Sequence, residues 1–382
     1  MMQVYDAIIV GAGPAGSTCA ARLHQAGLNV KLFDKKVFPR VKPCAGWVTP
    51  QVIESLQIDT GEYRRHNTFQ PITGFRTGII GGRVVETNYA EPVSYGILRI
   101  EFDDYLLRRS GVACEFQSVK QISRANGSWV VNESCVSPLL IGAGGHFCPV
   151  ARMLRNDQTF ARSPERGNGD TAPVVYAQEV EFEMASDSPS FPAVEAHRPE
   201  LYFCPDLQGY GWCFRKGNFL NVGLGRLDKT GLSKHMAAFW QFLRARNKLS
   251  APLPSQFHGH AYRLYAESSP KLCDDGVMLI GDSAGLAYPH SGEGIRPAIE
   301  SAIIAADVIA RVGENYDLQS LSAYERRLIQ RLGAVQSLQG RQWLPVAWLQ
   351  KLAAGLMATR WFARNTVIEN WFLHRDQPAL KI

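Results

Sequence analysis

The feature that most constrains this chain is a glycine-rich turn between two apolar segments near its start. Residues 5–10 are rich in β-branched side chains, which is typical of a buried parallel strand. Residues 11–16 follow at once with the pattern Gly-x-Gly-x-x-Gly, and a helical pattern extends from 17 to about 25. A second apolar run at 30–33 ends in Asp34. This order of strand, turn, helix, strand and acid predicts one βαβ unit.

Each glycine of the turn has a physical reason. Gly11 permits the tight turn, Gly13 lets the backbone approach a pyrophosphate, and Gly16 lets the helix pack closely on the strand. Free N–H groups at the helix N-terminus would bind the phosphates, and Asp34 would accept a hydrogen bond from a ribose hydroxyl. The sequence therefore predicts a dinucleotide site. Its expected contacts at this end are Gly11, Gly13, Pro14, Ala15, Gly16, Asp34 and Lys35.

A second motif far along the chain indicates which nucleotide is bound. Residues 277–280 form another apolar run that leads into Gly281 and Asp282, and residues 289–295 precede a long helical stretch. This arrangement resembles the second FAD motif of the p-hydroxybenzoate hydroxylase superfamily. The resemblance implies that Asp282 binds the ribityl and diphosphate region, and that the following helix begins at the flavin and stabilises its reduced form. The implied cofactor is FAD, with further contacts from Gly281, Gly292, Gly294 and Ile295.

The segment after the second strand extends the resemblance to the geranylgeranyl reductase family within that superfamily. Residues 39–46 are similar to a Lys-x-Cys-Gly-Gly segment that lies beside the flavin in this family. The resemblance implies that Lys42, Cys44 and Ala45 contact the cofactor. Cys44 is also a candidate for contact with the substrate, and the alternative is a small packed side chain.

Two more segments carry the same resemblance. Residues 98–103 are similar to an Arg-x-x-Phe-Asp helix start whose arginine, here Arg99, lies near the cofactor. Residues 209–216 are similar to the aromatic Tyr-x-Trp-x-Phe-Pro motif that lines the substrate cavity of these reductases. Tyr210 and Trp212 are therefore candidate catalytic-site residues, although aromatic side chains of a hairpin are often only core.

The end of the third strand departs from the aromatic hydroxylases of the superfamily. Those enzymes carry an Asp-Gly pair there, and this chain has Gly144 where the aspartate would stand. The difference disfavours a hydroxylase and leaves the question of an NADPH site open. Gly142, Ala143 and Gly144 remain expected FAD contacts. Flavin halogenases share the same frame, but their Trp-x-Trp-x-Ile motif is absent from the sequence.

These motifs predict an α/β fold in which other segments of the chain interrupt the FAD-binding domain. A discontinuous Rossmann-like domain would carry an inserted antiparallel β-sheet substrate domain, and a helical C-terminal region would follow. The FAD-binding domain is expected at residues 1–70, 95–160 and 270–310, the substrate or cap domain at 71–94 and 161–269, and the helical region at 311–382.

The insertions have the patterns of strands. Residues 75–89 and 210–225 each predict a hairpin with a turn that contains glycine. Residues 174–184 alternate apolar and polar side chains, as a half-exposed strand does. A sheet of this kind would form the floor of a substrate cavity over the flavin, and the Gly- and Pro-rich segment 164–173 predicts a loop.

The histidines have two different interpretations. His290 precedes the helix that would face the flavin, and the ordinary pKa of histidine suits a proton donor. The alternative is that its ring packs against the turn or caps it. His258 and His260 alternate along one face of an expected strand without a third ligand, so we predict no metal site.

Composition excludes several classes of protein. The net charge of +6 is mild and spread along the chain, which argues against a nucleic-acid partner. The eight cysteines form neither a CxxC pair nor a zinc spacing, and indicate free thiols in a reducing cytosol. The apolar run at 4–10 is too short for the core of a signal peptide, and no stretch reaches the length of a membrane span. We expect a cytoplasmic protein.

The C-terminal region raises a separate question because tryptophans lie among basic residues there. Such a composition can rest on a bilayer surface, which would make the protein membrane-peripheral and would suit a lipid substrate. The favoured alternative is that these aromatic side chains pack onto the flavin domain or a partner subunit. They are Trp343, Trp348, Trp361, Phe362, Trp371 and Phe372.

The resemblance and the motifs favour an FAD-dependent oxidoreductase, namely a reductase of carbon–carbon double bonds in an isoprenoid or other apolar substrate. Reduced flavin would give hydride to one carbon while a nearby acid protonates the other. The alternatives are an aromatic monooxygenase, a flavoenzyme that modifies a side chain of a partner protein, and a non-catalytic FAD-binding module. The expected partners are a small apolar or aromatic molecule and an external electron donor such as NAD(P)H, ferredoxin or another reductase.

Overall fold

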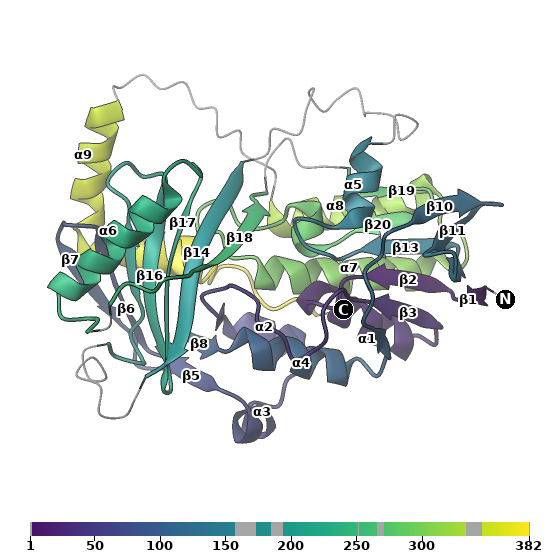
Figure 1. Ribbon diagram of the computed structural model, residues 1–382, viewed down its shortest axis with the longest axis horizontal. Coiled ribbons are helices and arrows are strands. Elements are labelled where there is room, and N and C mark those ends of the chain that lie inside the picture. Colours follow the sequence, from purple (N-terminus) through teal and green to yellow (C-terminus); the bar gives the residue numbers. More distant parts are fainter. Residues whose placement is uncertain are drawn as a thin grey trace.

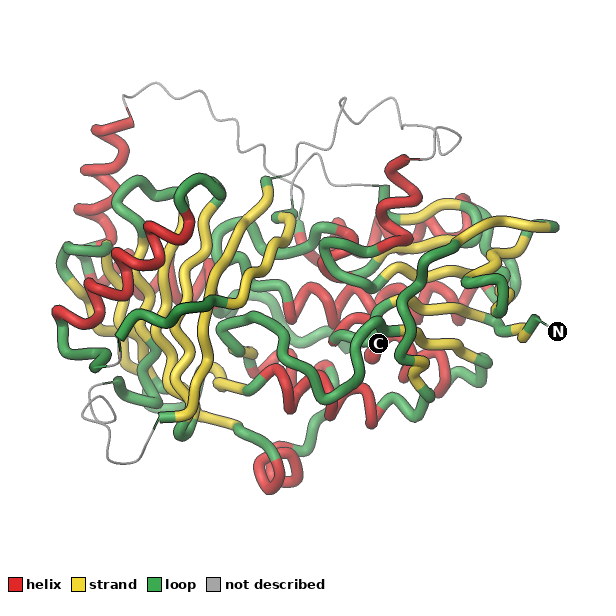
Figure 2. The backbone as a smooth tube through the Cα atoms, in the orientation of Figure 1, coloured by secondary structure: helices red, strands yellow, loops and turns green. Residues whose placement is uncertain are grey.

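The computed structural model describes residues 2–156, 173–184, 194–250, 252–265, 271–333 and 346–381. A mixed part of helices and strands lies on one side of the molecule, and a large twisted sheet lies on the other (Figure 1). The same division is visible by type of secondary structure (Figure 2). Of the expected loop at 164–173, all but the last residue falls outside the described residues.

A six-stranded sheet forms the nucleotide-binding part, as the first motif predicts. Its central strands β2 and β13 pair in parallel and are apolar along their whole length because both faces of the sheet are covered. The edge pair β19 and β20 is antiparallel. In sheet order the strands are β19 (Cys273–Asp274), β20 (Val277–Leu279), β13 (Leu139–Gly142), β2 (Ala7–Val10), β3 (Val30–Phe33) and β9 (Cys114–Glu115).

Helices that begin at the two glycine motifs pack against each other beside this sheet. α1 begins after the first motif and α7 after the second, and the two helices are in contact. A Cβ atom placed on Gly281 would lie 3.0 Å from the Cβ of Ala15, so the two motifs meet where these helices start. The helices of this part are α1 (Pro14–Gln25), α4 (Arg99–Arg109), α5 (Pro149–Asn156), α7 (Ile295–Val312) and α8 (Leu318–Leu332).

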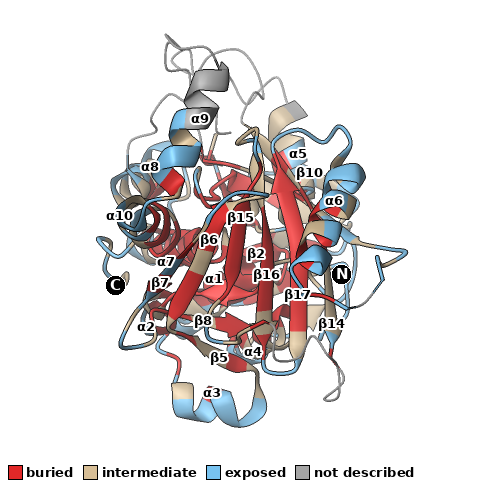
Figure 3. Ribbon diagram, turned by 90° about the vertical axis from the view of Figure 1, so that its left-hand side faces the viewer, coloured by how far each residue is buried: buried red, intermediate tan, exposed pale blue. Residues whose placement is uncertain are grey.

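A seven-stranded sheet forms the other part, and it confirms both predicted hairpins. Its neighbouring strands are antiparallel except for β15 and β6. α6 (Leu232–Ala245) covers the outer face, where Phe239 and Trp240 are buried. In sheet order the strands are β18 (His258–Arg263), β14 (Val174–Glu183), β17 (Phe219–Arg226), β16 (Gly209–Lys216), β15 (Glu200–Phe203), β6 (Gly74–Ile79) and β7 (Val84–Asn88), and β15 to β17 are largely buried (Figure 3).

Two smaller sheets and two short helices complete these parts. The three-stranded sheet joins the nucleotide-binding part to the seven-stranded sheet and contains β4 (Trp47–Val48), β8 (Ser94–Ile97) and β5 (Phe69–Ile72). The four-stranded sheet contains β1 (Gln3–Val4), β12 (Cys135–Ser137), β11 (Ser128–Val131) and β10 (Ile122–Ala125). The short helices are α2 (Pro50–Ser55) and α3 (Thr60–His66). The proposed domain boundaries stay a prediction, which the shared sheet of β6, β7 and β14 to β18 supports.

The described parts of the C-terminal region are mainly helical up to Phe372, and Trp371 and Phe372 pack on the rest of the molecule. Phe372 stacks on Trp47 with ring centroids 5.4 Å apart, and Trp371 lies edge-on to Phe203. Trp361 is instead 70% exposed, and Trp343 lies outside the described residues. None of the helices in the described ranges is long and apolar enough to cross a bilayer. The helices are α9 (Val346–Met357), α10 (Arg360–Phe362) and a π-helix at Ala363–Phe372.

Candidate active site

The first glycine motif has the tight geometry that the sequence predicts. Gly11 has a φ of +113°, and a Cβ placed on it would lie 2.4 Å from the carbonyl oxygen of Ala143. A Cβ on Gly16 would lie 1.7 Å from the carbonyl oxygen of Gly11, so these two positions require glycine for packing alone. Gly13 differs, because the nearest atom to its Cβ position is a guanidinium nitrogen of Arg40 at 3.4 Å. The space in front of Gly13 is therefore open to a ligand.

Asp34 holds this turn from the end of β3. Its carboxylate accepts a hydrogen bond of 2.8 Å from the backbone N–H of Ala12 and one of 2.9 Å from that of Lys36. The side chain also lines the cavity described next. The contact with a ribose hydroxyl stays a prediction, which the unused lone pairs of the carboxylate allow.

A cavity of about 690 Å³ runs from the glycine turn to the seven-stranded sheet. Of the predicted site residues, four do not line it: Gly16, Gly142, Gly281 and His290. The three glycines act through packing behind the wall. The predicted residues that do line it are Gly11, Gly13, Pro14, Ala15, Asp34, Lys35, Lys42, Cys44, Ala45, Arg99, Ala143, Gly144, Tyr210, Trp212, Asp282, Gly292, Gly294 and Ile295.

Two arginines share one buried carboxylate at the wall of this cavity. Asp103 is fully buried, and its oxygens accept hydrogen bonds from Arg99 at 2.7 and 2.9 Å, while Arg40 lies 3.2 Å away. Burial opposes the charge of Arg99, but the carboxylate of Asp103 outweighs this and raises its pKa above the ordinary value. Two fixed cations beside the glycine turn suit an anionic diphosphate. Arg40 was missed as a site residue because it belongs to no recognised motif position.

Lys42, His260 and Asp282 form a row across the cavity. The Lys42 Nζ lies 3.0 Å from both ring nitrogens of His260, whose Nε2 lies 3.7 Å from an Asp282 oxygen. Burial lowers the pKa of Lys42 to about 8, and burial also lowers the pKa of His260. Burial would raise the pKa of Asp282, but its contact with His260 and the charge of Lys42 outweigh this and lower it. His260 was considered from the sequence only as a metal ligand, but it is a residue of this site. No group of three potential metal ligands occurs among the described residues.

The inner face of the seven-stranded sheet supplies the opposite wall. Trp212 on β16 is opposite Gly223 on β17, which is opposite Glu179 on β14. A Cβ on Gly223 would lie 2.2 Å from the Trp212 ring, so this glycine lets the indole lie across β17 toward Glu179. The Trp212 indole N–H donates a hydrogen bond of 2.6 Å to the Asn221 side-chain oxygen.

β14 alternates buried and partly exposed side chains from Val174 to Glu179, as predicted. Glu179 lies on the buried face and is only 5% exposed, because the Cys44 segment covers it. Burial raises the pKa of Glu179 to about 7. Alternation shows which side chains share a face, but it does not show what packs on that face.

The segment that contains Cys44 is bound to the sheet by polar side chains. The Asn221 amide donates a hydrogen bond of 3.2 Å to the carbonyl oxygen of Cys44, and Lys216 donates one of 3.0 Å to that of Ala45. Lys216 is almost wholly buried and pairs with Glu181. Sequence reasoning missed Lys216 and Asn221. The asparagine inside the otherwise apolar start of β17 was an available signal, whereas Lys216 follows Arg215 at the end of β16 and gave none.

His290 lies outside the cavity, whereas Cys44 and Trp212 line it. The His290 ring is exposed and stacks on Trp371 with centroids 5.1 Å apart and 18° between the planes. The Tyr210 hydroxyl donates a hydrogen bond to the Ser291 carbonyl oxygen. This bond connects the loop at Ser291, which lines the cavity, to β16, whereas the preceding His290 is exposed.

Comparison with known proteins is consistent with this geometry. Residues 9–42 match the family described as an NAD(P)-binding Rossmann-like domain. The chain is 31% identical over 341 residues to the menaquinone reductase of Mycobacterium tuberculosis, across 80% of this chain and 76% of that protein. It is 28% identical over 332 residues to the geranylgeranyl diphosphate reductase of Rhodobacter capsulatus, across 79% and 74%. The chain belongs to the geranylgeranyl reductase family of FAD-dependent oxidoreductases.

The fold of this family member is also shared with a solved structure. A geranylgeranyl bacteriochlorophyll reductase-like protein from Thermoplasma acidophilum superposes with a TM-score of 0.72 at 19% identity, covering 98% of this chain and 99% of that one. FAD is the cofactor of this family member, and the cavity fits it. The open face of Gly13, the paired cations Arg40 and Arg99, and the N-termini of α1 and α7 form one continuous cradle for an anionic dinucleotide.

Proposed function

We propose that this chain reduces carbon–carbon double bonds of an isoprenoid substrate. The observation that carries the proposal is the single cavity that joins the FAD cradle to an aromatic wall on the seven-stranded sheet. That wall includes Trp47, Tyr210, Trp212 and Phe372. Flat aromatic surfaces of this kind suit an unsaturated hydrocarbon chain, and they offer few polar groups that would need partners. The names of the reductases in Mycobacterium tuberculosis and Rhodobacter capsulatus support the same class of substrate.

The chain's own residues would orient the reactants and exclude water. When bound and reduced, FAD supplies the two electrons as hydride. Arg99 and Arg40 would hold the diphosphate, while Lys42 would place positive charge at the cofactor. Tyr210 fixes the loop before α7, whose N-terminus would face the cofactor ring.

The test is a single-turnover reduction. Holoenzyme reduced with dithionite is mixed anaerobically with geranylgeranyl diphosphate or with a menaquinone that carries an isoprenoid tail, and the product is analysed by mass spectrometry. We expect one pair of hydrogens to be added to one of these probes. Oxidised holoenzyme is the control and should leave both probes unchanged. In a parallel reaction exposed to air, incorporation of oxygen into a probe without such hydrogenation would instead support the monooxygenase alternative.

We also propose that the C-terminal helices contact a membrane surface. Leu352 and Leu356, one turn apart on α9, are 57% and 41% exposed, and Trp361 is 70% exposed beside the exposed Arg360. Apolar side chains next to a cation suit an anionic bilayer. Trp361→Ala should reduce cosedimentation with vesicles that contain phosphatidylglycerol, whereas Val4→Ser, at another exposed apolar residue, should not. Equal sedimentation of both variants would contradict this contact.

A further inference from the structure

Glu179 is a buried carboxyl group on the substrate side of the cavity. It lies near the middle of β14, lines the cavity together with Cys44 and Trp212, and is only 5% exposed. Gly223 brings the Trp212 ring toward it, since a Cβ at that glycine would lie 2.2 Å from the ring and 2.8 Å from the Glu179 Cβ. The carboxyl group therefore lies beside the aromatic surface on which an apolar substrate would rest.

The hydrogen bonds of Glu179 leave room for a proton. The Asn221 amide donates hydrogen bonds of 3.2 Å to the Cys44 carbonyl oxygen and to Glu181. Its interaction with Glu179, and that of the Cys44 backbone N–H, lower the pKa of Glu179 less than burial raises it. A protonated carboxyl group can still accept from these donors through one oxygen and direct its own O–H into the cavity. Burial raises its pKa to about 7, so much of the population carries a proton at neutral pH.

The charged groups around Glu179 are few and partly cancel. Lys216 on β16 lowers its pKa and Glu181 on β14 raises it, and these two residues also pair with each other. His258 is the partner of Glu179 on β18, and its side chain is exposed. The covering segment contributes the Cys44 backbone bond. No full countercharge therefore forces Glu179 to ionise.

We infer that Glu179 is the proton donor for the reduction, an inference that rests on the proposed function. One carbon of the double bond takes the hydride that the reduced cofactor supplies, and the π electrons move to the other carbon. There they form a C–H bond with the proton of the Glu179 carboxyl group, whose O–H bond breaks. Glu179 is left as a carboxylate and recovers its proton from water. The substrate gains one hydride and one proton, and no further reactant is needed.

Two other groups are less suitable donors. His290 lies outside the cavity, where it stacks on Trp371. Burial also raises the pKa of Glu293 to about 7, but its carboxylate accepts a hydrogen bond of 2.8 Å from the backbone N–H of Arg296 and so caps α7. Glu179 lies within β14 and does not cap a helix.

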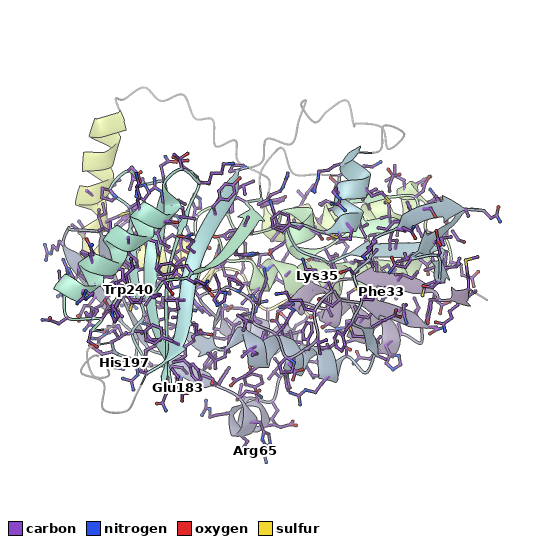
Figure 4. The ribbon with its side chains drawn as sticks, viewed as in Figure 1. Phe33, Lys35, Arg65, Glu183, His197 and Trp240 are labelled. Carbon is purple, nitrogen blue, oxygen red and sulfur yellow. The ribbon has the colours of Figure 1, made fainter. Side chains whose placement is uncertain are left out.

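The first test measures turnover with a matched control. In the anaerobic reaction of reduced holoenzyme with geranylgeranyl diphosphate or the menaquinone probe, Glu179→Gln should slow hydrogenation by ~10²–10⁴-fold because general acid catalysis contributes this much. Glu183→Gln is the matched control, and its hydrogenation rate should equal that of the wild type. Glu183 lies on the same side of β14 as Glu179, but it is exposed at the end of the strand and lies away from Lys35, which lines the cavity (Figure 4). The wild-type rate should fall as the pH rises through about 7, and the Glu179→Gln rate should show no such fall. An unchanged rate and pH profile in Glu179→Gln would overturn the inference.

The second test does not depend on activity. Because folding raises the pKa of Glu179 from 4.5 to about 7, the folded state binds this proton more tightly than the unfolded state. Its stabilising effect is complete below the unfolded pKa and is lost as the pH rises through the folded pKa. The Tm of the wild-type holoenzyme should therefore fall relative to that of Glu179→Gln as the pH rises from 4.5 to about 7, and the difference should level off above that pH. A constant difference in Tm would show an ionised Glu179 and refute the donor role.

The outcomes separate the inference from the proposed function. If the wild-type protein hydrogenates neither probe, the proposed function fails and the donor role fails with it, whatever the Tm shows. If the wild type hydrogenates a probe and Glu179→Gln keeps the wild-type rate, only the donor role fails.

Discussion

The two ends of the cavity are built by different means. At the nucleotide end the turn of Gly11 and Gly13 and the helix N-termini present backbone to the cofactor, and the contacts come from short continuous segments. At the sheet end, side chains from three strands and one loop meet at Trp212 and Glu179. A backbone site depends on local sequence, whereas a side-chain site depends on strand register. Four substitutions with successively weaker effects test this contrast.

Gly13→Val should abolish FAD binding while leaving the protein folded. The new side chain would meet the Arg40 guanidinium, which can move, and would otherwise extend into the space for the pyrophosphate. Flavin absorbance and the circular dichroism of the purified protein measure the two effects. Gly16→Val is the contrasting variant and should fail to fold, because its Cβ would lie 1.7 Å from a backbone oxygen. Yellow, FAD-loaded Gly13→Val protein would contradict the backbone-built cradle.

Asp103→Asn should destabilise the protein strongly. Arg99 is buried, and removal of its only charged hydrogen-bond partner among the described contacts leaves an uncompensated charge, which costs about 3–5 kcal/mol. Urea denaturation measures the change in free energy of unfolding. Asp104→Asn is the matched control, because its partner Arg108 is largely exposed and such a pair contributes about 0–1 kcal/mol. Equal losses of unfolding free energy in Asp103→Asn and Asp104→Asn would show that burial of the Arg99–Asp103 pair does not contribute to stability.

Trp212→Phe should have a moderate effect. The variant keeps an aromatic wall but removes the indole N–H that donates to Asn221, which should cost about 1 kcal/mol of stability. A double-mutant cycle with Asn221→Leu measures the coupling. Complete additivity of the two substitutions would mean that the hydrogen bond does not organise the wall.

His290→Ala should have the smallest effect. The ring stacks on Trp371 outside the cavity, so hydrogenation and the flavin spectrum should both stay close to those of the wild type. The single-turnover hydrogenation rate of His290→Ala is compared with the rates of the wild type and of Glu179→Gln. A loss of ~10²-fold or more would return the proton-donor role to the histidine.

The success and failure of sequence interpretation follow the same contrast. The strands and turns around Gly11 and Gly281 were predicted because each is a continuous segment whose pattern states its own conformation. The hairpin of β16 and β17 was predicted for the same reason. The position of His290 was not, because neighbouring residues in a loop can face opposite directions. The loop is connected to β16 by the bond from Tyr210 to Ser291, two residues 81 positions apart.

The nucleotide-binding unit, the FAD motifs and the family can be inferred from the sequence alone, since glycine spacing and strand composition act over a few residues. Strand alternation likewise places Glu179 and Glu181 on one face of a strand. That this face is covered can be seen only in the folded protein, because the covering segment at Cys44 is more than a hundred residues away in the chain. The same is true of the row from Lys42 through His260 to Asp282, whose members come from three distant segments. Burial and charge at a point in space depend on which segments meet there, and that meeting sets the pKa of Glu179.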